Sequence, residues 1–164
     1  MKIQVEFDSN QVFRYRLLGY ENRAIADSDF RNDAVDAGEV GSGHQVVALY
    51  EIERSSGSAD GPLATVNLRW KAPKVAGQDP NEIEVTEIKS EVFPENAAAS
   101  FDAASQGFRR SALVAQFAEI LRRSTHADGD SFDTLITEML KLEKEIKDKD
   151  FTEFCLLVLS LIHI

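Results

Sequence analysis

The sequence predicts an α+β protein in which an antiparallel β-sandwich-like sheet is followed by a subdomain of two or three helices. Five stretches that alternate like strands occupy the first part of the chain, and turn residues separate them. Stretches with helical periodicity follow these strands and do not alternate with them, an order that favours α+β over a parallel α/β fold. We expect a β domain over residues 1–93 and a helical subdomain packed on it over residues 100–158.

The first two strands are expected on either side of a turn at Asp8–Asn10. Apolar and polar residues alternate in "KIQVEF", and "QVFRYRLLGY" has an apolar pair before alternation resumes at Tyr15. A hairpin is predicted next, because the strand-like stretches "QVVALYEIER" and "LATVNLRWK" flank the polar loop "SSGSADG". The fifth strand is predicted in "EIEVTEIK", and its apolar side would be supplied by Ile83, Val85 and Ile88.

Helical periodicity begins in "SALVAQFAEILRRS", where five apolar residues are expected to share one face: Leu113, Val114, Phe117, Ile120 and Leu121. A second helix is expected near Ser131, with Asp130 as its N-cap and Asp133 in its first turn. A third is expected after Asp150, with Glu153 in a capping-box-like contact. The final apolar run "CLLVLSLIHI" is too short to span a bilayer. Residues 159–164 of this run match the in-frame reading of a sequencing adapter, and we expect them to be a sequencing-adapter artefact.

Composition narrows the classes of partner. The sequence has 28 aspartates and glutamates and 18 lysines and arginines, which gives a net charge of −10. We therefore expect that the chain neither binds nucleic acid nor inserts into a membrane. Cys155 is the only cysteine, which excludes an intrachain disulfide and a zinc site built from several cysteines. The opening "KIQVEF" lacks the order of a signal peptide, so the signal of an exported parent would lie further upstream.

The most unusual stretch runs from Gly19 to His44 and contains six carboxylates and four glycines. Carboxylates are the ligands that calcium prefers, and the candidate ligands are Asp29, Asp33, Asp36 and Glu39. The sequence does not match an EF-hand loop that begins at Asp27. Such a loop needs Asp or Asn at its fifth position and glycine at its sixth, where this chain has Arg31 and Asn32. We therefore expect a solvated connection whose Asp and Asn side chains bond locally, and no cofactor. The alternative is a small-ligand or calcium-binding module that uses residues 21–39.

No constellation of catalytic residues emerges from the sequence. "GEVGSGH" lacks the Lys-Ser or Lys-Thr and the helix of a phosphate loop, so its glycines are expected to permit positive φ or a bulge at a strand entry. His44 has no partner at ligand-like spacing, and it is expected to donate to a backbone carbonyl. Cys155 lies in an apolar helix, where an inert thiol is expected. We therefore predict that the chain is not an enzyme.

Two further groups have simple structural interpretations. Tyr15, Tyr50 and Trp70 are expected to pack in the core, with an exposed aromatic patch as the alternative. Two basic pairs are expected to bind the chain's own carboxylates and not nucleic acid; these pairs are Arg109 with Arg110 and Arg122 with Arg123.

The first third of the chain also carries unusual phrases. These are "YRLLGYENR" (Tyr15–Arg23), an acidic segment with Asp29, Phe30 and Asp36–Glu39, and the stretch Gly41–Glu51. Together they resemble the start of the C-terminal region of bacterial YfbK-like proteins, which carry a von Willebrand factor type A domain. "LATVNLRWK" and "FRRSALVAQFAEILRRS" are similar to the next strand and first helix of that region.

The resemblance implies a von Willebrand factor type A domain upstream of this chain. The metal-dependent adhesion motif of that domain, Asp-x-Ser-x-Ser, does not occur in the sequence. The resemblance therefore implies a non-catalytic accessory region that contacts the upstream domain or other proteins. It also implies a bacterial parent that is exported or associated with the cell envelope.

Overall fold

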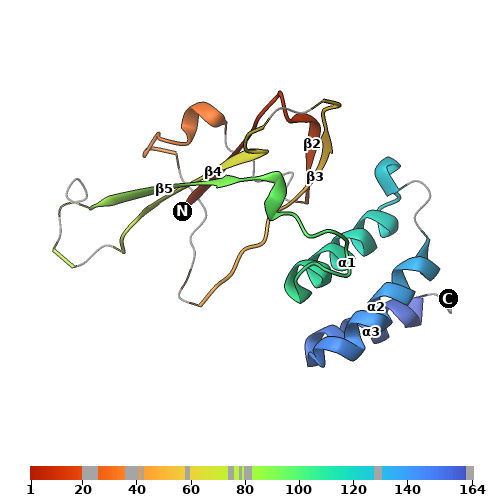
Figure 1. The fold of residues 1–164 in the computed structure, drawn as a ribbon. Coiled ribbons are helices and arrows are strands. Elements are labelled where there is room, and N and C mark those ends of the chain that lie inside the picture. The colour runs from red at the N-terminus through yellow and green to blue at the C-terminus, as the bar shows by residue number, and fades with distance from the viewer. Residues whose placement is uncertain are drawn as a thin grey trace. The chain divides into compact units, whose positions relative to one another are not determined.

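The computed structural model describes residues 1–19, 26–35, 41, 43–57, 60–73, 76–77, 79, 83–127 and 131–161. The chain divides into two compact units, Met1–Ala97 and Ala98–Ile164. Among the described residues, the first unit, the β unit, contains five strands, and the second, the helical unit, contains three α-helices (Figure 1). The predicted α+β class, with strands before helices, is confirmed.

The strands of the β unit form two antiparallel sheets. The larger sheet has the order β1-β4-β5, with β1 at Lys2–Phe7, β4 at Ala64–Lys71 and β5 at Val85–Val92. The smaller sheet pairs β2 (Val12–Leu18) with β3 (Leu49–Arg54). The predicted hairpin between the third and fourth strands is therefore wrong, because β3 and β4 belong to different sheets. A hydrophobic pattern identifies a strand but leaves the choice of its neighbour to long-range packing.

The turn between β1 and β2 is confirmed, and it directs the two strands into different sheets. The Asn10 N–H donates to Asp8 Oδ1 at 2.8 Å, and the Gln11 N–H donates to the Asp8 carbonyl at 2.9 Å. The pairing of β2 is irregular between Val12 and Arg14. Val12 is buried whereas Phe13, the next residue of the strand, is 71% exposed.

The register of the larger sheet separates an apolar face from a polar face. Ile3 pairs with Leu68, which in turn pairs with Ile88. The same face of the sheet carries Ile3, Val5, Phe7, Ala64, Val66, Leu68, Trp70, Ile88 and Val92. Val85 pairs with Lys71 and lies on the polar face, so the prediction that it shares a side with Ile88 is wrong.

One aromatic residue connects the two sheets. The Phe7 ring stacks on the Tyr15 ring, with 4.2 Å between centroids, and meets the Tyr50 ring edge-on at 5.3 Å. Tyr15 remains 57% exposed, and Trp70 is half-buried on the larger sheet. The prediction that these aromatics pack in the core is therefore wrong for Tyr15, whereas Tyr50 and Trp70 are half-buried.

The helices begin where side chains cap them. α1 spans Gln106–Leu121, α2 spans Phe132–Ile146 and α3 spans Lys149–Leu161. The side chains of Ser105 and Ser131 cap α1 and α2, and Asp148 Oδ1 accepts the Phe151 N–H at 2.9 Å. The N-cap of α2 is therefore Ser131 and not Asp130, which lies outside the described residues. α3 begins before Asp150, so Glu153 has no capping role and pairs with Lys149 instead, at 3.7 Å.

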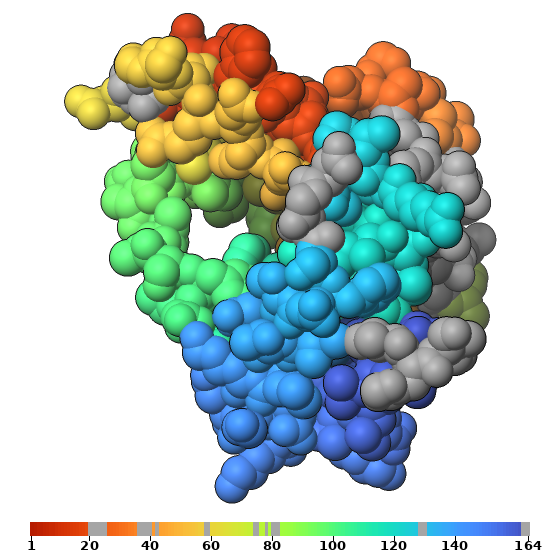
Figure 2. Space-filling view, turned by 90° about the vertical axis from the view of Figure 1, so that its right-hand side faces the viewer, coloured from red at the N-terminus to blue at the C-terminus, as the bar shows by residue number. Residues whose placement is uncertain are grey.

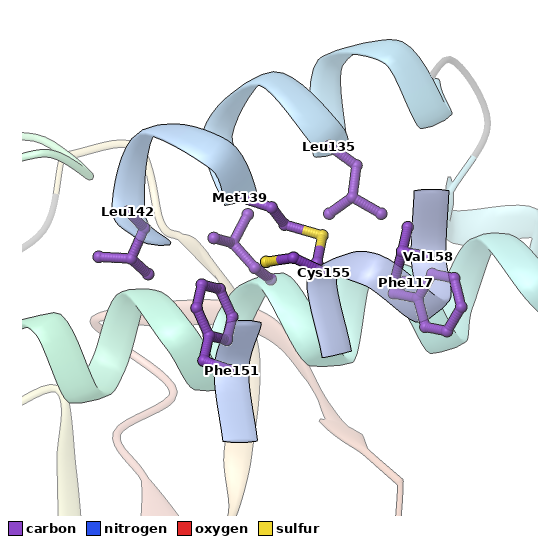
Figure 3. Packing of buried hydrophobic residues seen from close by; sticks show 8 residues of the cluster. Phe117, Leu135, Met139, Leu142, Phe151, Cys155 and Val158 are labelled. Carbon is purple, nitrogen blue, oxygen red and sulfur yellow. The ribbon is translucent and has the colours of Figure 1, made fainter. Parts of the chain in front are cut away.

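The helical unit has a continuous hydrophobic core (Figure 3). Leu135, Leu142 and Val158 have no exposed surface, and side chains of all three helices meet around them. In the space-filling view, the cyan end of α1 lies next to the light-blue α2 (Figure 2). Val114 and Leu121 are 41% and 52% exposed, so the apolar face predicted for α1 is narrower than expected. No helix in the described part of the chain is long and apolar enough to cross a membrane.

Candidate functional site

The acidic clasp, residues 26–35, lies against the polar face of the larger sheet. Lys2 reaches it from β1, and its Nζ donates to the carbonyl oxygens of Asp29 at 2.8 Å and Asn32 at 2.5 Å. Gln4, two residues further along β1, donates from Nε2 to Asp27 Oδ1 at 3.1 Å. Lys2 is only 8% exposed, so two backbone acceptors compensate the loss of water around its ammonium group.

The local structure of the acidic clasp follows from its own residues. Asp27–Asp29 forms a short 3-10 helix, and the Ala34 N–H donates to Asn32 Oδ1 at 3.1 Å. Phe30 is 7% exposed and is the buried apolar residue of the segment. Side-chain bonds to the nearby backbone thus shape the acidic clasp, as predicted for this connection.

A network of ion pairs closes the other end of the acidic clasp. Asp33 Oδ1 lies 2.9 Å from Arg69 Nη2, and its other oxygen lies 3.3 Å from Lys71 Nζ. Glu87 Oε1 lies 2.7 Å from Arg31 Nη2, and its Oε2 lies 3.3 Å from Arg69 Nη1. Hydrogen bonds from Arg69 lower the pKa of Asp33, and those from Arg31 lower the pKa of Glu87. Both carboxylates therefore stay ionised and hold the segment on β4 and β5.

Of the four predicted metal ligands, the structure describes Asp29 and Asp33. Asp29 Oδ1 accepts from Asn32 Nδ2 at 3.3 Å, and Asp33 faces two cations. Asp36 and Glu39 lie outside the described residues. In the part of the chain that the structure describes, no group of three His, Cys, Asp or Glu side chains could hold a metal ion. The two described carboxylates instead attach the acidic clasp through local and cross-strand contacts.

The sequence identified Asp33 of this network but missed Glu87 and the basic partners of both carboxylates. Alternation in "KIQVEF" does place Lys2 and Gln4 on one side of β1. The residues they contact are distant, since 27 positions separate Lys2 from Asp29 and 36 separate Arg69 from Asp33. No local signal in the sequence predicts such pairs.

The opposite, apolar face of the sheet is partly open. Ile3 on β1 is 43% exposed, and Ile88 on β5 is 47% exposed. Leu68, which lies between them on β4, is half-buried. Adjacent apolar side chains on three neighbouring strands form a surface of the kind that protein partners cover.

Three of the four arginines in the predicted basic pairs bind the chain's own carboxylates, and among the described residues no carboxylate pairs with Arg123. Arg109 Nη1 lies 2.6 Å from Glu145 Oε2, and the guanidinium carbon lies 5.8 Å from the centroid of the Phe101 ring. Further ion pairs of the helical unit join Arg110 with Asp148 and Arg122 with Glu119. Arg109 is 3% exposed, so it serves the packing of α1 and not an external ligand.

Neither His44 nor Cys155 belongs to a reactive constellation among the described residues. His44 is exposed, and β3 begins only at Leu49, so the expected strand entry at His44 is wrong. Its N–H donates to the Gly41 carbonyl at 3.1 Å, while Gly43 has the predicted positive φ, at 79°. Cys155 is 4% exposed, and burial raises the pKa of its thiol, so the thiol stays protonated.

The fold and these contacts define a mixed α+β region with a strand-rich first unit and a helical second unit. A family model described as "Uncharacterized protein YfbK, C-terminal" matches residues 1–163, and the chain belongs to this family. The chain is 29% identical over 150 residues to the uncharacterized protein YfbK of Escherichia coli (strain K12). This alignment covers 80% of the chain and 24% of the relative, so the chain spans only part of that relative's length. No solved structure matches the chain.

Proposed function

We propose that this chain is a non-catalytic interaction region of a longer protein and that it docks a von Willebrand factor type A domain upstream of it. The observation that carries the proposal is the difference between the two faces of the larger sheet. The chain's own acidic clasp covers the polar face, whereas Ile3 and Ile88 leave the apolar face partly open. Burying such a surface against a partner is favourable by about 25 cal/mol per Å² of apolar area.

The choice of partner follows from the family and from the chain's share of its relative. Since the chain covers 24% of YfbK, most of the relative's length lies outside the matched region. The phrases that resemble YfbK-like proteins imply an upstream type A domain, which is a partner present at high effective concentration in the same chain. By the same resemblance, we propose that the parent acts at the bacterial cell envelope or outside the cell.

Binding of the 164-residue chain to its separately produced type A domain tests this proposal. We expect association in titration calorimetry, with a negative heat-capacity change from apolar burial. Ile3→Asp introduces a charge on the apolar face of β1, and it should weaken binding by about tenfold or more, because an unpaired charge would be buried.

Phe13→Asp is the matched control. Phe13 is 71% exposed and lies on the smaller sheet, so this variant should bind as tightly as the unmodified chain. Equal losses for Ile3→Asp and Phe13→Asp would show that the apolar face has no special role. Absence of binding between the unmodified chain and the type A domain, both in trans and when linked, would contradict the proposal itself.

A further inference from the structure

The free side of β5 is the longest unpaired strand edge of the larger sheet. Within the described part of the chain, β5 pairs with β4 alone, over eight consecutive positions without a register shift. Residues 87–92 are all exposed, and in Figure 2 the light-green residues near the end of β5 lie at the surface. Val85–Val92 contains no proline and no bulge, two devices that usually protect such an edge from pairing.

The backbone groups available on this edge follow from the ladder with β4. The Ala72 N–H donates to the Glu84 carbonyl at 3.4 Å, and the Leu63 N–H donates to the Val92 carbonyl at 2.7 Å. Even-numbered residues of β5 therefore direct their backbone groups to β4, because successive residues of a strand alternate. The N–H and C=O groups of Glu87, Lys89 and Glu91 point away from β4 and are available to another strand.

We propose that the partner on this edge is β5 of a second copy of the chain, with Ser90 facing its symmetry mate in an antiparallel pair. In this register Lys89 lies opposite Glu91 of the partner subunit, and the contact occurs twice. Both side chains are accessible, at 61% and 43% exposure, and pair with each other within one chain at 3.3 Å. Dimerisation therefore exchanges the intrachain ion pair of each copy for two cross-strand ion pairs.

The apolar face is complementary in the same register. Ile88 lies opposite Val92 of the partner subunit, again twice, and these are the two exposed apolar residues of β5, at 47% and 39%. The dimer has a continuous antiparallel sheet of six strands, with one polar and one apolar face. Moving the register by two residues in one direction would place Lys89 opposite its own symmetry mate, and like charges directly opposite one another are destabilising.

Charge reversal tests the edge pairing, with sedimentation of the full 164-residue chain as the measurement. Lys89→Glu places two glutamates against two others, and Glu91→Lys does the same with lysines, so each should raise the dimer Kd about tenfold or more. The double variant should restore dimerisation, and a mixture of the two single variants should form heterodimers. Lys144→Glu, an equal charge change at an exposed position of α2, should have no effect.

Cross-linking tests the register. Facing positions that do not exchange hydrogen bonds lie about 4.5 Å apart between Cα atoms, within the range of a disulfide. Ser90→Cys should therefore form a covalent dimer under mild oxidation, whereas Thr86→Cys, about 27 Å from its mate at ~3.4 Å per residue, should not. The unmodified chain, with Cys155 buried, is the control for background oxidation. Three results would overturn the proposal: a chain that stays monomeric, a dimer unaffected by Lys89→Glu, or a failure of Ser90→Cys to cross-link. Circular dichroism verifies that each variant is folded.

Discussion

The helical unit and the β unit bury their apolar residues to different extents. Eight buried apolar side chains form one cluster in the helical unit, whereas the described part of the β unit buries four: Val12, Phe30, Leu63 and Ala64. The β unit relies instead on directed contacts between the acidic clasp and the sheet, such as those of Lys2 and Asp33. The helical unit buries its apolar side chains in its own core. The sheet leaves apolar side chains on one face partly exposed, and a protein partner could bury them.

The difference has a physical origin in the number of layers. An element that is apolar on one side must bury that side against another layer. The three helices cover one another's apolar stripes, and their side chains interdigitate around Met139 and Cys155 (Figure 3). In the β unit, the described covering segment lies on the polar face and leaves Ile3 and Ile88 partly exposed.

The largest expected effect is the loss of a core side chain in the helical unit. Leu142 has no exposed surface, so Leu142→Ala should lower the free energy of unfolding by about 2–5 kcal/mol through lost burial and a residual cavity. Urea unfolding followed by circular dichroism measures this loss. Leu156→Ala in α3 is the control, since Leu156 is 61% exposed and the same change there should cost less than about 0.5 kcal/mol. Equal losses would contradict the description of this core.

A smaller effect is expected at the start of α3. Asp148→Ala removes the acceptor of the Phe151 N–H and the partner of Arg110, and it should cost about 1 kcal/mol. Asp150→Ala is the comparison, because it keeps the cap and removes only one acidic residue from the first turn. If Asp150→Ala proved the more damaging variant in thermal unfolding, the helix would begin where the sequence alone suggests.

The acidic clasp should make the β unit sensitive to acid. The pKa values of Asp33 and Glu87 lie below their ordinary values of 3.8 and 4.5 in the folded protein. Their contribution to stability is therefore fully present above those ordinary values and is lost as the pH falls through the lower, folded values. Asp33→Asn should flatten the fall of the melting temperature between about pH 5 and pH 2, and an unchanged fall in this variant would contradict the role of Asp33.

The smallest expected effect is that of calcium. Arg69 and Lys71 already neutralise Asp33, so a calcium ion would have to displace two cations to bind there. Millimolar calcium should therefore leave the melting temperature unchanged. A rise that follows RT ln(1 + [L]/Kd) would instead favour the calcium-binding alternative for residues 21–39.

Periodicity predicted much of the fold, because it reports directly on which side of an element is buried. The alternation in "KIQVEF" and "LATVNLRWK" located β1 and β4 and their apolar faces. It failed where local chemistry shifts a boundary by a few residues, as with the caps of Ser105 and Asp148. It also failed at Val85, since a short strand fits either face until its partner fixes the register.

For the candidate site, the sequence predicted some of the residues but not the contacts between them. Asp29 and Asp33 were identified as carboxylates in an acidic stretch, and the predicted local bonding is seen in the contact between Asp29 and Asn32. The sequence could not predict that Lys2 contacts Asp29 or that Arg69 and Lys71 pair with Asp33. These contacts join positions that only the folded sheet brings together.

By itself, the sequence determined the α+β class, the strand and helix periodicities and the family, because these properties reside in local patterns and local phrases. The tertiary structure alone decided that β3 pairs with β2, that the acidic clasp covers a polar sheet face and that one edge of β5 has no partner among the described residues. Strand partners and ion pairs are chosen by packing and electrostatics between distant segments. Those energies exist only once the chain has folded.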